Sequence, residues 1–148
     1  MALDVCALVC GGGRALGDEW FVFFNNPAAP GGCVRTATPA APDRAALRVD
    51  FGALPAEADR LVLAAAIDPE THPDADLTGF TEARVRLADA AGSELDRLPV
   101  SDGRPGETAL VLGSFRRRPG GDWRFVAGGR GYPGGLAPLL RDHGIEVA

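Results

Sequence analysis

The side chains that could do chemistry in this sequence are few, and their spacing is unfavourable for common catalytic and metal-binding sites. His72 and His143 are the two histidines, and neither lies beside a nucleophile or in a metal-ligand spacing. One acidic loop could offer oxygen ligands to Ca²⁺, but it lacks the residue order and central glycine of an EF-hand loop. Its acids are Asp68, Glu70, Asp74 and Asp76. We therefore expect a solvated acidic loop and a protein that is not an enzyme.

The glycine-rich stretch GGRGYPGG, residues 128–135, is a second candidate, because bare backbone N–H groups can cradle a phosphate. It matches neither the G-x-x-x-x-G-K-[ST] loop nor a G-x-G-x-x-G turn inside a βαβ unit. The structural interpretation is stronger: the glycines let the chain leave a strand, turn with positive φ and begin a helix close to the sheet. We expect Tyr132 to pack there and to anchor the turn through its hydroxyl.

Charge and hydropathy exclude several classes of partner. The net charge is −5 and the pI is near 4.9, which disfavours a general nucleic-acid binder. We therefore interpret Arg116, Arg117 and Arg118, which precede Trp123, as a solvated hairpin tip. No apolar run reaches about 18 residues, so we expect no membrane insertion. The apolar start of the chain lacks a charged leader, and we expect no signal peptide.

Three cysteines indicate the redox environment. On one strand, Cys6 and Cys10 would lie about 13 Å apart at ~3.3 Å per residue, which is too far for a disulfide. An odd number without a paired spacing is typical of reduced thiols in a cytoplasmic protein. We expect Cys6 and Cys10 to act as small buried hydrophobic residues.

Short apolar runs separated by Gly and Pro predict an all-β fold, an antiparallel sandwich or barrel in a single domain over residues 1–148. The predicted strands are Val5–Cys10, Trp20–Phe24, Leu47–Phe51, Arg60–Ile67, Thr81–Leu87, Leu95–Val100, Thr108–Phe115 and Trp123–Ala127. Helix propensity alone would favour a helix at Arg60–Ile67, but its turn-rich flanks favour a strand. One short helix is predicted at Leu136–His143, stopped by Gly144. Asn25–Arg44 is predicted to lack regular structure.

Four segments, taken in order, resemble the TerD family of tellurite-resistance and stress proteins. They are GDEWFVFFNNPAAPGG, VDFGALPAEADRLVLAAAID, ETALVLGSFRR and GDWRFVAGGRGYPGGLAPLLRDHGI. The resemblance implies a β-sandwich with Greek-key character and a bacterial, cytoplasmic, non-catalytic role in resistance to tellurite, phage and chemical stress. It also implies Ca²⁺ binding by acidic loops and work inside larger assemblies.

Two departures from the family pattern bear on these expectations. Met1 falls inside a strand that the family precedes with a glycine-rich hairpin, so we expect the leading strands to be missing. The family's acidic calcium loop is replaced by RTATPAAPDRAALRVDF, which keeps only Asp43, and the preceding D-x-D pair is reduced to Asp4. Few carboxylates bind Ca²⁺ weakly. We therefore expect no cofactor and at most weak Ca²⁺ binding, at Asp4 and Asp43, with Asn25 and Asn26 shaping the loop.

Two functions remain open at this point. The first is a binding or scaffold module whose open sheet edge accepts a partner strand or a second copy, with tellurite-resistance-type proteins among the partners. The apolar segment Trp20–Phe24 is the candidate contact, and replacing Phe23 by Asp should break an assembly without affecting an ion site. The alternative is a stress protein that binds a small molecule, an oxyanion or Ca²⁺, with the cysteines as further ligands.

Overall fold

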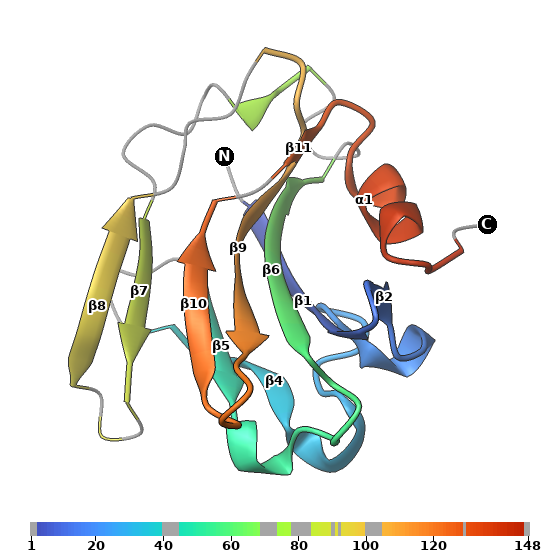
Figure 1. Ribbon diagram of the computed structural model, residues 1–148. Coiled ribbons are helices and arrows are strands. Elements are labelled where there is room, and N and C mark those ends of the chain that lie inside the picture. Colours follow the sequence, from blue (N-terminus) through green and yellow to red (C-terminus); the bar gives the residue numbers. More distant parts are fainter. Residues whose placement is uncertain are drawn as a thin grey trace.

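One antiparallel sheet dominates the computed structural model, which describes residues 3–39, 45–68, 74–77, 84–89, 91, 93–99, 105–128 and 130–146 (Figure 1). Its central order is β10-β9-β6-β1-β2, with β3 also paired to β1 and β11 to β9. The strands of this sheet are β1 Leu3–Gly11, β2 Arg14–Ala15, β3 Phe21–Val22, β6 Arg60–Ile67, β9 Ala109–Arg117, β10 Trp123–Ala127 and β11 Gly131–Tyr132.

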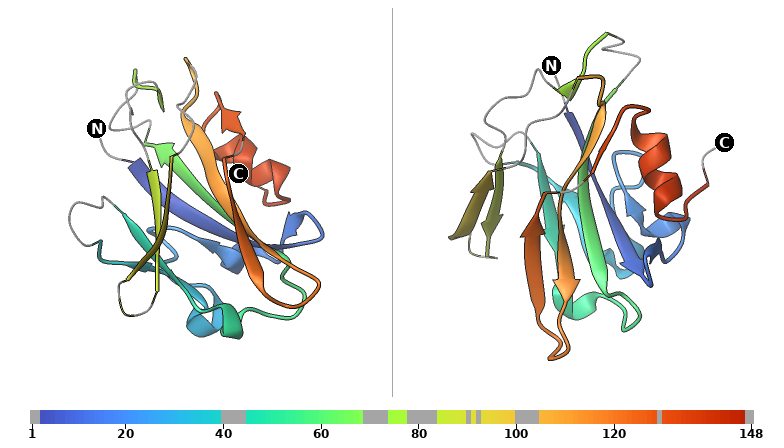
Figure 2. Two further views of the ribbon diagram at one scale, coloured as in Figure 1. Left: turned by 60° about the vertical axis from the view of Figure 1, so that its left-hand side comes forward. Right: turned by 45° about the horizontal axis from the view of Figure 1, so that its top comes forward.

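Two hairpins and one helix complete the described fold. The hairpins join β4 Val34–Ala37 to β5 Ala46–Val49, and β7 Arg84–Ala88 to β8 Glu94–Pro99. The helix α1 spans Leu136–Asp142, and three short 3-10 turns lie at Asp18–Trp20, Pro30–Gly32 and Phe51–Ala53. The turned views show the hairpins on one side of the large sheet and α1 on the other (Figure 2). The predicted all-β, antiparallel fold with one short C-terminal helix is therefore confirmed.

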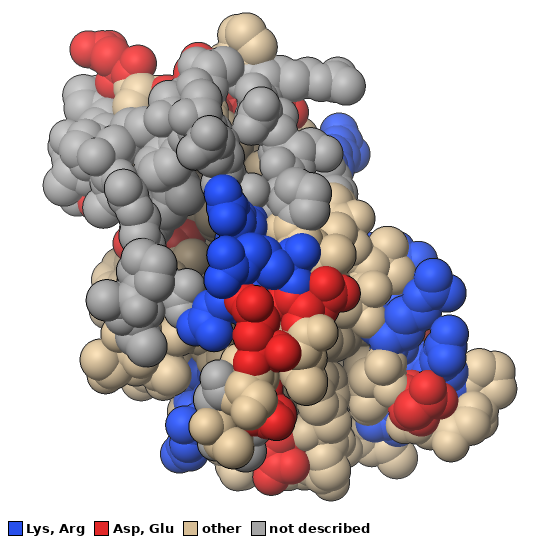
Figure 3. Space-filling model, turned by 90° about the vertical axis from the view of Figure 1, so that its left-hand side faces the viewer, with Lys and Arg blue, Asp and Glu red and all other residues tan. Residues whose placement is uncertain are grey.

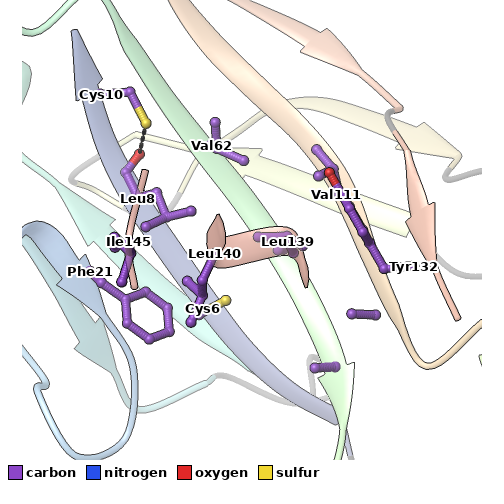
Figure 4. Close-up of a cluster of buried hydrophobic side chains, with 13 residues drawn as sticks. Cys6, Leu8, Cys10, Phe21, Val62, Val111, Tyr132, Leu139, Leu140 and Ile145 are labelled. Atoms are coloured by element: carbon purple, nitrogen blue, oxygen red, sulfur yellow. Dashed lines mark hydrogen bonds between the residues drawn. The ribbon is translucent and has the colours of Figure 1, made fainter. Parts of the chain in front are cut away.

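Side chains of β1 alternate between the two faces of the large sheet, and both sets are part of the hydrophobic core. Cys6, Leu8 and Cys10 point toward α1 and belong to a cluster that includes Leu139 and Leu140 (Figure 4). Ala7 and Val9 point the other way, toward a cluster that includes residues of the β4–β5 hairpin. Because β1 is buried on both faces, a slip of one residue in its register would exchange the two clusters.

The strand at Arg60–Ile67 and the helix near Leu136 are confirmed. Leu61 to Ile67 are all buried, so the requirement for burial on both sides of a sheet overrides the local helix propensity. The helix ends in a Schellman motif: Gly144 has φ of 80°, its N–H donates to Arg141 O, and Ile145 N–H donates to Leu140 O. Among the described residues, no helix has the length and hydropathy that crossing a bilayer requires.

Two predictions about the N-terminal half were wrong. Asn25–Arg44 was predicted to be irregular, but it contains β4, whose first residue Val34 is fully buried. Trp20–Phe24 is a strand only at Phe21–Val22, because a 3-10 turn precedes it and a tight turn follows it. The predicted strand Thr81–Leu87 is seen as β7 from Arg84 onward, and residues 81–83 lie outside the described residues.

Candidate functional site

The two edges of β1 are paired to different extents. Along one edge, Leu3 through Cys10 pair continuously with β6. Along the other, β3 pairs only with Ala7 and Leu8, and β2 only with Cys10 and Gly11. Within the described part of the chain, Leu3–Cys6 therefore have no strand partner on this second side. We call this segment the open lane of β1.

The open lane exists because β3 turns away after two residues. Phe23 and Asn26 exchange backbone hydrogen bonds of 3.1 and 3.0 Å, which closes a tight turn over Phe24 and Asn25. The Asn26 side-chain amide donates to Phe21 O at 2.8 Å and to Glu19 O at 3.2 Å. Asn favours turns because its side chain can bond to nearby backbone groups. The turn thus directs the chain toward β4 and leaves the lane empty.

An aromatic ladder leads from the core to the tip of this turn. Phe21 is buried, and its ring stacks on Phe23 with centroids 4.5 Å apart. Phe23 is half-buried and meets Phe24 edge-on at 5.3 Å. The Phe24 side chain is 72% exposed and is one of two large hydrophobic residues in the described chain with such exposure. Trp20 and Val22 pack in one core cluster and Phe21 and Phe23 in the other, whereas Phe24 lies at the turn.

The predicted site residues are therefore only partly brought together. Phe23, Asn25 and Asn26 form the turn beside the lane, and Asp4 is exposed within the lane. Asp43 lies outside the described residues, so the predicted pair with Asp4 is not tested. Sequence reasoning placed Phe24 on a strand within the Trp20–Phe24 contact, although the turn-favouring run Asn25, Asn26 and Pro27 directly after it could have indicated a turn.

Tyr132 lies in a different place and has the anchoring role that was predicted for it. Its hydroxyl donates to Asp142 Oδ2 at 2.8 Å and so ties β11 to α1. Burial, followed by the contact with Asp142, raises the pKa of Tyr132 to about 12. Arg130 lies over the Tyr132 ring at 5.0 Å and also pairs with Asp142 at 3.1 Å.

The acidic residues of the described chain do not form a ligand cluster. No group of three or more His, Cys, Asp or Glu residues that could hold a metal ion occurs within the described ranges. Asp76 accepts a hydrogen bond from Gly106 N–H at 2.8 Å, so it connects two loops rather than being simply solvated. Glu70 lies outside the described residues.

The three cysteines are free and buried, as was predicted for Cys6 and Cys10, and Cys33 is buried as well. Burial raises the pKa of the Cys6 thiol to about 12 and that of Cys10 to about 11, and it also raises the pKa of Cys33. The thiolate is the nucleophile and the metal ligand. The three cysteines are therefore kept as protonated thiols, which are poor nucleophiles and poor metal ligands.

The described chain is thus an antiparallel β-sheet protein with a helix on one face, an open lane on a central strand and an exposed aromatic turn. Residues 1–143 match the family model described as TerD domain, and the chain belongs to that family.

Known proteins of this family resemble the chain along most of its length. Tellurium resistance protein TerD from Serratia marcescens is 30% identical, over 99% of this chain and 79% of that protein. The Bacillus subtilis protein YceE, named as uncharacterized, is 33% identical over 98% of this chain and 79% of its own length. The crystal structure of a homologue of telluride resistance protein (TerD) from Streptomyces coelicolor has a TM-score of 0.69 at 20% identity, covering 95% of this chain and 83% of that one. That likeness establishes the fold alone.

Proposed function

We propose that this TerD-family chain is a non-catalytic module of the stress response, which binds a protein partner or a second copy of itself through the open lane of β1. The observation that carries the proposal is the unpaired edge of Leu3–Cys6, next to the exposed ring of Phe24. Unpaired N–H and C=O groups on a strand edge attract another strand. A partner strand would gain main-chain hydrogen bonds from the lane and an apolar contact from Phe24.

Calcium binding is proposed to be weak or lost. The sequence offers only Asp4 and Asp43 where the family has an acidic loop, and Ca²⁺ needs about 6–8 oxygen ligands. Asp4 stands on a strand, whose extended backbone presents its carboxylate singly. Reduced, buried thiols suit a cytoplasmic protein, which is where we propose that the module acts.

Light scattering coupled to size-exclusion chromatography tests the interaction. We expect a dimer, or a complex with a co-expressed tellurium-resistance relative, and we expect Phe24→Asp to weaken it at least tenfold because a charge would be buried. Leu95→Asp is the matched control: Leu95 is 68% exposed but lies on β8, away from the lane. Circular dichroism checks that both variants fold.

Two results would refute the proposal. One is a monomer that binds no relative at any concentration tested. The other is a complex that Leu95→Asp weakens as much as Phe24→Asp does. Calorimetry with CaCl₂ tests the calcium part separately, where a micromolar dissociation constant would show that the ion site is intact.

A further inference from the structure

Three arginines lie in one row across the large sheet. Arg124 on β10 is directly opposite Arg116 on β9, and Arg116 is directly opposite Arg60 on β6. Residues directly opposite each other present their side chains on the same face of a sheet. The row continues to Cys10 on β1, which belongs to the cluster under α1, so all three arginines lie on the α1 face. Their strands are adjacent where β10 and β6 begin and β9 ends (Figure 1).

Like charges directly opposite on neighbouring strands are destabilising, so a counter-charge would stabilise this row. Among the described residues, no carboxylate forms an ion pair with any of the three. Asp122, on the same hairpin, pairs with Arg118 at 3.5 Å instead. Arg116 Nε donates to Ser114 Oγ at a long 3.4 Å, and Arg60 Nε is buried without a hydrogen-bond partner.

A second pair of opposite arginines shows how such charges can be satisfied. On the β7–β8 hairpin, Arg86 and Arg97 are also directly opposite each other, and Glu94 lies 4.0 and 2.8 Å from them. Basic and acidic side chains accordingly lie side by side on the face of the molecule that carries this hairpin (Figure 3). Arg117, which alternates to the opposite face from Arg116, lies over the Trp123 ring at 4.8 Å and donates to Ala56 O, although its Nε, like that of Arg60, is buried without a hydrogen-bond partner.

Among the described residues, the row therefore lacks a carboxylate such as the one that Glu94 provides on the β7–β8 hairpin. Each guanidinium offers donors in a planar fork that matches the oxygens of a phosphate. Adjacent strands lie about 4.8 Å apart, so the three arginines span about 10 Å at the backbone, enough to surround one or two tetrahedral groups. We propose that Arg60, Arg116 and Arg124 form a binding site for a phosphate-type oxyanion with two or more negative charges, either free in solution or on a lipid headgroup.

This site is separate from the open lane. Arg60 is paired with Cys10, while the lane begins at Leu3, which is paired with Ile67. The near end of the lane is Cys6, which is paired with Ala64, four residues along β6 from Arg60, so about 13 Å of strand separates the two sites. Experiments can thus refute anion binding by the arginine row while the lane still binds its partner, and they can refute partner binding while the row still binds an anion.

The test is calorimetric titration of the full chain with pyrophosphate at low ionic strength. We expect saturable binding that weakens as salt is added, and at least a fivefold loss of affinity in Arg116→Gln and in Arg124→Gln, both at exposed positions. Arg48→Gln is the matched control, because Arg48 on β5 is exposed and directly opposite Arg35, a pair without a third arginine. It should bind as the wild type does.

A second arm identifies the source of the anion. Co-sedimentation with phosphatidylcholine vesicles, with and without phosphatidylglycerol, would support a lipid headgroup if binding required the anionic lipid and Arg116. Pyrophosphate should also raise the melting temperature of the wild type but not that of the Arg116→Gln, Arg124→Gln double variant. The proposal is overturned by absence of binding in both arms, or by an equal loss in Arg48→Gln.

Discussion

The hydrogen bond from Tyr132 to Asp142 provides the sharpest quantitative test of how this fold is held together. Tyr132→Phe removes the hydroxyl and keeps the ring, so the variant loses the 2.8 Å bond to Asp142 without creating a large cavity. Hydrogen bonds to charged groups contribute about 1.5–3 kcal/mol. Because the Asp142 side chain is 46% exposed, we expect the low end, about 1.5 kcal/mol. For a chain of this size, that loss lowers the melting temperature by about 5 °C.

A double-mutant cycle separates this bond from its neighbours. Urea unfolding, followed by the fluorescence of Trp20 and Trp123, gives the free energy of unfolding for Tyr132→Phe, for Asp142→Asn and for both together. Arg130→Gln is measured alongside, because Asp142→Asn also breaks the exposed pair with Arg130, which contributes little. A coupling energy below about 0.3 kcal/mol would refute the assignment of this bond as the tie between β11 and α1.

The raised pKa of Tyr132 also predicts how the stability of the fold changes at alkaline pH. The folded pKa of Tyr132 is about 12 and its ordinary value is 10, so folding favours the neutral phenol. The stability that this phenol contributes is fully present below pH 10 and is lost as the pH rises toward 12, because the unfolded chain then binds fewer protons. The stability difference between wild type and Tyr132→Phe should narrow over that range. A constant difference from pH 9 to 12 would contradict the raised pKa.

Two further predictions concern thiols and turns. Because all three thiols are buried and have raised pKa values, a disulfide reagent should label the native protein far more slowly than the urea-unfolded protein, and one thiol that reacts as fast as free cysteine would contradict this. Gly144→Ala should cost about 1–2 kcal/mol in urea unfolding, from left-handed backbone strain. A Cβ at that position would also lie 2.6 Å from Arg14 Nε. Gly13→Ala, at φ 84° in open space, should therefore cost less, and an equal or greater cost would show that the contact is irrelevant.

The elements that sequence reasoning predicted are those whose signal is local. The run from Leu61 to Ile67 is apolar at every position, which suits a strand covered on both faces. The helix near Leu136 has its apolar spacing and its stop at Gly144 within a few residues. β4 was missed because Val34 is its one buried residue, and Arg35 and Thr36 beside it are exposed.

The candidate sites depend on contacts that the sequence does not display. β3 ends where the Asn26 side-chain amide donates a hydrogen bond to Phe21 O. This contact depends on the folded turn and not on the strand propensity of the residues in β3. The arginine row requires the register of β6 against β9, which shifts at a bulge between Leu63 and Ala64. A pattern of alternation within one strand carries no information about that shift. Which charged residues lie opposite each other on neighbouring strands could therefore be seen only in the structure.

The cluster around Cys6, Leu8 and Cys10 has a consequence for synthesis of the protein. Leu139, Leu140 and Ile145, which cover these side chains, are translated more than a hundred residues after them. In a nascent chain this face of β1 therefore stays uncovered until more than a hundred further residues have been made. Such delayed, long-range closure slows folding and exposes the intermediate to aggregation. We expect this protein to depend most on chaperones during translation, before these covering residues have been made.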